Sequence, residues 1–275
     1  MDDRKLPFMD HLGELRLRLR NAVLALVLGC ALAYPFAETL FALLARPLLV
    51  AYAQKFPGKN FDFFFGALTE PFWVFFEVSI YAGVFVASPV IFHQLWRFIA
   101  PGLYDKEKRV AVPFAFFSAF MFVGGALFAY YLVLPAAYRF FLSYSSENIG
   151  RMKSILGFEL DVLPQSVGIQ EMLFMQPYLD FAKKMLIAFG LIFELPLLIF
   201  FLAYAGVVTH RKLWKWNKYW IILSFVIGGL LTPGPDIMSQ LLMAAPLIVL
   251  YNLSIGIAFF VTRRRERNEQ AAATP

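Results

Sequence analysis

Six long apolar runs dominate the sequence, and the short segments between them carry much of its charge. Each run is near the length of about 20 apolar residues that a helix needs to cross a bilayer core. Inside lipid, a helix satisfies its own backbone hydrogen bonds, so the pattern predicts an all-α integral membrane protein with six transmembrane helices. The expected spans are residues 21–41, 71–96, 110–134, 181–206, 216–232 and 238–261.

The composition leaves room for one membrane domain and no second globular domain. Hydrophobic residues make up 60% of the 275 residues and charged residues only 16%, below the roughly 25% of soluble domains. We expect an amphipathic N-terminal helix over residues 1–20, a transmembrane domain over 21–261 and a basic tail over 262–275. The charged start of the chain does not resemble a cleavable signal peptide, so the first span is expected to remain in the mature protein.

The distribution of Lys and Arg predicts the orientation. Seventeen of the 25 basic residues fall on one side of the predicted spans, and the other eight are spread over two longer loops on the other side. Because positively charged loops stay in the cytoplasm, both termini are expected there, in a multi-pass protein of the cytoplasmic membrane. The net charge of +6 then reflects orientation and anionic lipid headgroups rather than nucleic-acid binding.

One carboxylate lies deep in a predicted span. Glu194 comes about twelve residues into the fourth apolar run, where a charge costs on the order of 2.5 to 3.5 kcal/mol on insertion scales. Its side chain is expected to face protein or trapped water, either as a site or partner contact or as a packing hydrogen bond. Glu77 and Glu38 are predicted nearer the outer face, where a structural role is the simpler interpretation.

Two further carboxylates lie on the predicted cytoplasmic face. Residues 10–20 form an expected interfacial helix that contains Glu14, with Leu12, Leu15 and Leu19 on one face. Residues 98–109 form a loop with a Pro-Gly turn and Glu107. Glu14 and Glu107 either neutralise nearby basic residues or bind a cationic peptide, because carboxylates accept guanidinium in bidentate fashion. The residue pattern alone leaves both alternatives open.

The sequence contains no recognisable catalytic, metal or nucleotide motif. The three histidines are scattered without metal-ligand spacing, and neither a Ser/His/Asp arrangement nor a Walker-type loop is present. We therefore expect no enzymatic activity, no metal and no cofactor. Cys30, the single cysteine, is expected to be a small packing residue.

Several motifs resemble those of the TatC family, the multi-span subunit of the twin-arginine protein translocase. Residues 11–16 (HLGELR) are similar to its H-L-x-E-L-R motif, and residues 98–109 (FIAPGLYDKEKR) to its cytoplasmic loop motif. The resemblance extends over nearly the whole chain. Further matches are residues 46–48 (RPL), 189–196 (FGLIFELP), the turn 232–236 (TPGPD), and Ser239 with Gln240.

The resemblance implies a receptor for signal peptides that carry two consecutive arginines and direct the export of folded proteins. Glu14 and Glu107 would bind the arginines. The loop and its surroundings would supply apolar contacts and the positioning of these groups, through Phe98, Pro101, Leu103, Tyr104, Arg16 and Arg109.

The resemblance also implies single-span partners of the TatA and TatB type, homo- and hetero-oligomers, and energy from the proton motive force. Glu194 and Gln240 would make polar contacts with a partner or with the signal peptide inside the membrane. Pro47 and Asp236 would have structural roles at the outer face, although Asp236 could equally cap the sixth helix. The family fold is a curved, concave set of helices.

Two features of this sequence depart from the family pattern. The outer loop over residues 138–179 is longer than usual, with an insertion around 151–171, and the turn at 233–236 carries an additional residue. From the residues alone, a proton-coupled small-solute transporter that uses Glu194 remains a competing hypothesis. A passive membrane scaffold is a third.

Overall fold

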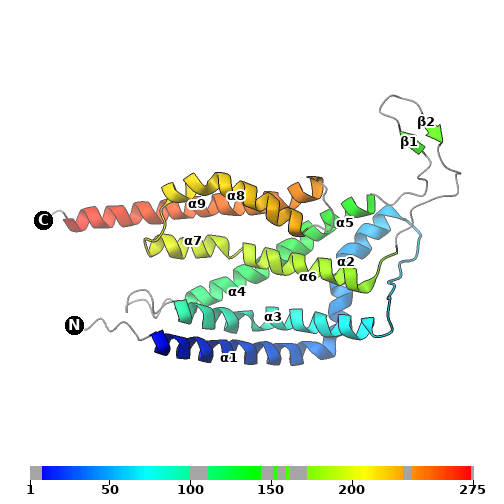
Figure 1. The fold of residues 1–275 in the computed structure, drawn as a ribbon, viewed down its shortest axis with the longest axis horizontal. Coiled ribbons are helices and arrows are strands. Elements are labelled where there is room, and N and C mark those ends of the chain that lie inside the picture. The colour runs from blue at the N-terminus through cyan, green and yellow to red at the C-terminus, as the bar shows by residue number, and fades with distance from the viewer. Residues whose placement is uncertain are drawn as a thin grey trace.

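The computed structural model describes residues 8–99, 111–143, 151–153, 159–161, 172–231 and 237–273. Most of its helices run side by side along one direction (Figure 1). In chain order the elements are α1 (Phe8–Ala33), the 3-10 turn η1 (Tyr34–Phe36), α2 (Ala37–Lys55), α3 (Glu70–Ile99), α4 (Ala111–Phe128), the π-helical segment η4 (Ala129–Val133), α5 (Leu134–Ser143), β1 (Arg151–Lys153), β2 (Glu159–Asp161), α6 (Met175–Ile192), α7 (Leu195–Tyr204), α8 (His210–Leu231) and α9 (Ile237–Ala273).

The helical membrane fold expected from the sequence is confirmed, with the addition of a small two-stranded hairpin. Within the described residues, five helical stretches are long and apolar enough to cross a membrane, and α8 is a further helix of 22 residues. The first half of α8 carries Arg211, Lys212, Lys215 and Lys218, which explains why its apolar part is shorter than the others. The five stretches are Leu12–Lys55, Glu70–Ile99, Val112–Ser143, Met175–Tyr204 and Gln240–Arg264.

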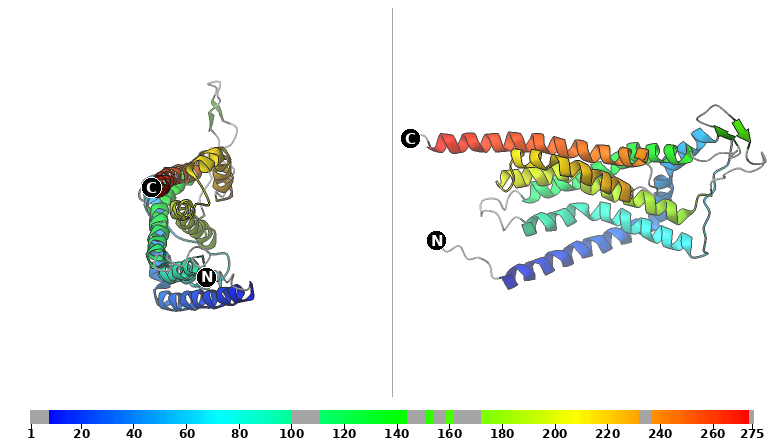
Figure 2. Two further views of the ribbon diagram at one scale, coloured as in Figure 1. Left: turned by 90° about the vertical axis from the view of Figure 1, so that its left-hand side faces the viewer. Right: turned by 45° about the horizontal axis from the view of Figure 1, so that its top comes forward.

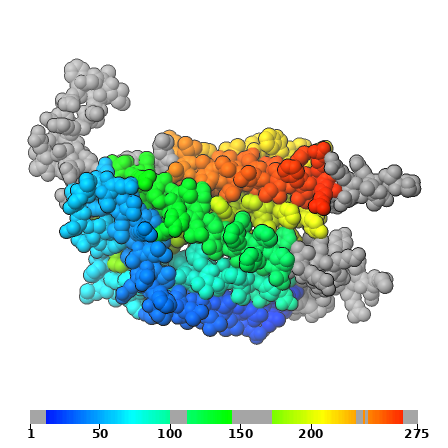
Figure 3. Space-filling view, turned by 180° about the vertical axis from the view of Figure 1, so that it is seen from behind, coloured from blue at the N-terminus to red at the C-terminus, as the bar shows by residue number. Residues whose placement is uncertain are grey.

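The first apolar run differs from its predicted bounds of 21–41. The amphipathic segment and the first span form one continuous helix, α1, which ends at Ala33. A 3-10 turn that contains Pro35 follows, because proline removes a backbone donor and clashes with the preceding turn. The chain then continues as α2 in a different direction, and α2 packs across α5 and α3 (Figure 3).

Three other runs are interrupted or extended. The third continues from α4 through η4 into α5, and the fourth is divided at Phe193 and Glu194 into α6 and α7. Pro196 lies in the first turn of α7, where its missing N–H is tolerated. The sixth helix does not end at residue 261, because α9 continues through the basic segment to Ala273.

Glycines allow two pairs of helices to touch through their backbones. A Cβ on Gly83 of α3 would lie 2.7 Å from the backbone nitrogen of Cys30 in α1, and a Cβ on Gly29 would lie 2.7 Å from the Gly83 carbonyl. In the same way Gly125 of α4 abuts the Phe189 carbonyl of α6. Small residues at such crossings allow the close approach that drives helix association in lipid.

Seen end-on, the helices form the curved wall that was expected, with α1 at one edge and α8 at the other (Figure 2, left). Neighbouring helices pack in the order α1, α3, α4 and α6, and α7, α9 and α8 form the second half. Much of the surface carries exposed large apolar side chains, as a lipid-facing protein requires.

At one end of the bundle the loops pack against one another. Phe64, in the loop between α2 and α3, pairs with the segment before α6: its N–H donates to the Leu173 carbonyl and its carbonyl accepts from the Met175 N–H, both at 2.9 Å. The long loop before α6 contains an antiparallel hairpin in which Arg151 pairs with Asp161 and Lys153 with Glu159. The hairpin projects beyond the bundle (Figure 1).

Candidate functional site

One end of the bundle gathers the elements that carry the predicted peptide-binding motifs. The start of α1, the end of α3 and the start of α4 all lie at this end, together with the start of α8 and the end of α9 (Figure 1). This arrangement follows from α1 and α3 running in opposite directions while they pack along their length. We call this end of the molecule the basic end, because Arg97, Arg211, Lys212, Arg263 and Arg264 belong to it.

Glu14 lies on α1 near the basic end and is half-buried. It is engaged by Arg18, one helical turn further on, whose Nε lies 3.1 Å from Glu14 Oε1 and whose Nη2 also contacts that oxygen. Arg16 is exposed on the same helix. Within the described residues, both contacts of Arg18 go to the same Glu14 oxygen, Oε1.

Phe98 lies in the last turn of α3 and is half-buried. It is the one member of the predicted loop site whose position the described ranges include. The remaining predicted members lie outside the described residues: Pro101, Leu103, Tyr104, Glu107 and Arg109. The two helix ends that flank them, Ile99 and Ala111, both lie at the basic end.

Glu194 occupies the break between α6 and α7, inside the apolar stretch Met175–Tyr204. Its carboxyl group lies near Ser118 of α4. Its Oε1 atom is buried and has no hydrogen-bond partner within the described part of the chain. Ser118 in turn accepts a hydrogen bond of 2.7 Å from the indole nitrogen of Trp96 in α3. This buried hydrogen bond joins α3 to α4 within the apolar helical stretches.

Gln240 and Pro47 have local structural contacts. The Gln240 side-chain amide donates a 2.8 Å hydrogen bond to the Phe225 carbonyl of α8, and it packs on Gly229. Gln240 therefore joins the start of α9 to α8. Pro47 is buried inside α2. Asp236 lies outside the described residues.

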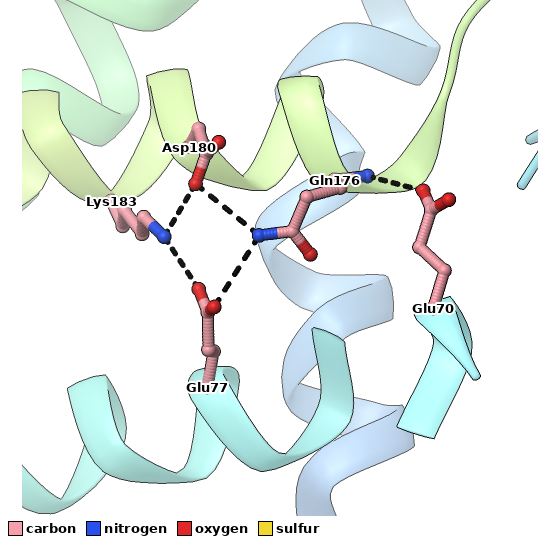
Figure 4. Close-up of polar contacts among 5 residues, drawn as sticks. All are labelled: Glu70, Glu77, Gln176, Asp180 and Lys183. Carbon is pink, nitrogen blue, oxygen red and sulfur yellow. Dashed lines mark hydrogen bonds and ion pairs between the residues drawn. The ribbon is translucent and has the colours of Figure 1, made fainter. Parts of the chain in front are cut away.

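A second polar cluster lies at the end of the bundle opposite the basic end (Figure 4). Lys183 Nζ lies 2.5 Å from Glu77 Oε2 and 2.5 Å from Asp180 Oδ1. The Gln176 amide group bridges Glu77 and Asp180, each at 3.4 Å. The backbone N–H of Gln176 donates to Glu70 at 3.0 Å, and that of Gly66 to the other Glu70 oxygen at 2.6 Å.

This cluster was not among the predicted sites. The predicted fourth span begins at residue 181, whereas α6 begins at Met175. The helix extends beyond the apolar run because its polar side chains find partners on α3. A spacing signal was present, since Gln176, Asp180 and Lys183 recur at i, i+4 and i+7 on one helix face.

The fold and its polar groups define the class of protein. It is a multi-pass membrane protein whose charged side chains are suited to binding a ligand and to holding helices together. Comparison with known proteins specifies that class further. The family model described as Sec-independent protein translocase protein (TatC) matches residues 10–246. The chain belongs to this family.

Relatives over the full length support the assignment. A protein of Desulforapulum autotrophicum named Sec-independent protein translocase protein TatC is 39% identical over 272 residues, which cover 99% of this chain and 91% of that protein. One of Aquifex aeolicus with the same name is 36% identical over 266 residues, 97% of this chain and 100% of that protein.

Two crystal structures described as the twin arginine translocase receptor TatC also match. The first has a TM-score of 0.71 and is 37% identical, and the match covers 92% of this chain and 99% of that chain. The second, determined in DDM, has a TM-score of 0.72 and is 36% identical, and the match covers 90% of this chain and 99% of that chain. The chain is therefore a component of the Sec-independent, twin-arginine protein translocase, a transport subunit rather than an enzyme.

Proposed function

We propose that this chain is the receptor for twin-arginine signal peptides, and that it binds them at the basic end on the cytoplasmic face. Glu107 and Glu14 bind the two arginines. Phe98, Leu103 and Tyr104 make apolar contacts beside them, while Pro101, Arg16 and Arg109 shape and position the loop.

The observation that carries the proposal is the meeting of both motif-bearing segments at one end of the bundle. Glu14 and Arg18 lie in the second and third turns of α1, and the last turn of α3 brings Phe98 and the entry to the loop to the same end. An arginine pair spaced along an extended peptide needs two carboxylates on one surface, each able to accept a bidentate guanidinium. Apolar side chains beside them suit the apolar part of a signal peptide.

The same end supports the proposed orientation. The start of α1 and the end of α9 lie at the basic end, and the described Lys and Arg of α8 and α9 are concentrated there (Figure 1). By the positive-inside rule this end faces the cytoplasm, in the cytoplasmic membrane. The Glu70 and Lys183 cluster then faces outward.

Within the membrane, Glu194 serves the contact with single-span partners of the TatA and TatB type or with the inserted signal peptide. Within the described residues the buried Oε1 atom has no hydrogen-bond partner, which supports this role because a polar atom in hydrocarbon gains most from a new hydrogen bond. Gln240, which joins the start of α9 to α8, belongs to the same set of polar contacts inside the membrane. Export of folded proteins is driven by the proton motive force in assemblies that contain several copies and partners.

Photocrosslinking tests the receptor role. A photoreactive residue at Gly13 is suitable, because a Cβ there meets nothing within 4 Å and the position adjoins Glu14. A matched site at Leu68, which is 92% exposed at the opposite end, is the control. We expect a twin-arginine peptide to crosslink at 13 and not at 68, and a peptide with two lysines to crosslink less.

The crosslink at 13 should be lost in Glu107→Gln and in Glu14→Gln, while both variants still insert into the membrane. Equal crosslinking of the arginine and lysine peptides would contradict the proposal. Solute flux in vesicles that depends on Glu194 and ignores Glu107 would instead favour a small-solute transporter.

A further inference from the structure

An apolar cavity of about 280 Å³ lies between α2, α3, α4, η4 and α6, all within stretches long and apolar enough to cross a membrane. Lys183 is the charged member of its described lining, and the ammonium group is already paired with Glu77 and Asp180. The Tyr130 hydroxyl, also in the lining, donates a 2.7 Å hydrogen bond to the Leu43 carbonyl. The polar groups of these two side chains therefore have partners, and the cavity offers mainly hydrocarbon contacts.

The cavity opens toward the surface of the bundle, where a membrane protein meets lipid. Leu43 of α2, Leu127 of α4 and Tyr131 of η4 all line it, and they are 54%, 50% and 69% exposed. Water does not fill apolar space of this kind. An empty cavity would leave its lining without contacts on one side, at a cost that grows with its volume. We therefore expect the surrounding bilayer to supply the occupant.

The size of the cavity suits a hydrocarbon chain. Because an apolar cavity of about 150 Å³ takes a benzene ring, a volume of about 280 Å³ suits roughly ten carbon atoms. A transmembrane helix is about 10 Å wide with its side chains, and it packs against its neighbours over several turns. A partner helix therefore needs a larger groove, whereas part of a single acyl chain fits.

An exposed cation lies near the opening. Arg46 follows Leu43 by three positions on α2, so the two side chains share a helix face, and Arg46 also lies near Tyr130. Its guanidinium can bind a phosphate group in bidentate fashion. Helix α2 lies toward the end of the bundle opposite the basic end (Figure 1). Arg46 is therefore suited to a lipid headgroup of the leaflet at that end.

We propose that this cavity binds one acyl chain of an anionic phospholipid, whose phosphate group pairs with Arg46. The bound chain contacts α2, α3, α4 and α6 together, and so stabilises the position of α2 across the bundle. This binding site is separate from the proposed signal-peptide site at the basic end, and its test does not depend on signal-peptide binding.

Lipid binding to the purified full-length protein tests the proposal. Native mass spectrometry measures the bound lipid after addition of phosphatidylglycerol or phosphatidylcholine with the same acyl chains, which differ in headgroup charge. We expect phosphatidylglycerol to bind about twofold to fivefold more tightly at one site, the effect of one partly exposed ion pair. It should also raise the melting temperature in detergent more than phosphatidylcholine does, because binding to the folded state stabilises it.

Two substitutions of valine by tryptophan separate the cavity from the general lipid surface. Val123 lines the cavity, so Val123→Trp should fill it and lower the binding of both lipids at this site at least fivefold. Val86 of α3 is 58% exposed and is not part of the described lining, so Val86→Trp should leave binding unchanged. Leu127→Trp, at an exposed lining position, replaces Val123→Trp if that variant does not fold.

The headgroup contact has its own matched pair. Arg46→Gln should abolish the preference for phosphatidylglycerol while phosphatidylcholine still binds. Arg139→Gln removes the same charge from an exposed position on α5 and should keep the preference.

Unchanged lipid binding in Val123→Trp would overturn the proposal, and so would an unchanged headgroup preference in Arg46→Gln. A third contrary outcome is that Val123→Trp retains the lipid but loses a copurifying single-span partner, because the cavity would then hold a helix.

Discussion

Lys183 of α6 and Glu77 of α3 form an ion pair of 2.5 Å within helical stretches long and apolar enough to cross a membrane. Asp180 shares the same ammonium group, so one cation satisfies two carboxylates. Lys183 also lines an apolar cavity of about 280 Å³ between α2, α3, α4 and α6. The ion pair therefore joins α3 to α6 at the edge of this mainly apolar cavity.

Removal of this ammonium group should destabilise the protein. We expect Lys183→Met to cost about 1 to 3 kcal/mol, less than the loss of a fully buried pair because both side chains are partly accessible. Lys184→Met makes the same chemical change at the neighbouring, exposed residue and should be close to neutral. Thermal unfolding in detergent measures both, and equal melting temperatures for the two variants would contradict the assignment.

Two adjacent glycines of α4 should respond differently to the same substitution. A Cβ on Gly125 meets the Phe189 backbone, whereas a Cβ on Gly124 meets nothing within 4 Å. Gly125→Ala should therefore separate α4 from α6 and cost about 1 to 3 kcal/mol. Gly124→Ala should be neutral or slightly stabilising, because alanine favours helix more than glycine does. The folded yield and melting temperature of each variant provide the comparison.

Glu70 should hold the loop between α2 and α3 against α6. Its two carboxylate oxygens accept the backbone N–H groups of Gly66 and Gln176, one from each segment. In Glu70→Ala we expect faster hydrogen exchange across residues 56–69 and at the start of α6. Glu38→Ala, at an exposed position in the first turn of α2, is the control. Unchanged exchange in Glu70→Ala would assign the loop's order to the Phe64 backbone pairing alone.

Arg18 should compete with the signal peptide for Glu14. Because Arg18 already contacts Glu14 Oε1, Arg18→Gln should free the carboxylate and strengthen peptide binding about twofold to fivefold, the scale of one partly accessible ion pair. Arg20→Gln removes the same charge from an exposed position on α1 and should not strengthen binding. Titration with a labelled twin-arginine peptide measures both. Weaker binding in Arg18→Gln would mean that Arg18 orients Glu14 for the ligand.

The apolar runs predicted the helical membrane fold well, but not where its helices break. Hydropathy measures only the cost of placing a segment in lipid, and the segments around Pro35 and Glu194 are apolar on both sides of the break. The turn at Tyr34–Phe36 and the division of the fourth run at Glu194 depend on proline geometry and on neighbouring helices. Hydropathy also put the predicted start of the fourth span at residue 181, six residues after α6 begins at Met175.

The sequence by itself determined that the chain is a multi-span helical membrane protein and carries TatC motifs, because apolar length and motif residues are local properties. The tertiary structure alone decided which distant polar groups meet. Lys183 with Glu77, and Trp96 with Ser118, lie 106 and 22 positions apart. The first contact joins α3 to α6 and the second joins α3 to α4, helices that meet only when the chain is folded. No local pattern encodes such a contact, since its geometry depends on both helices at once.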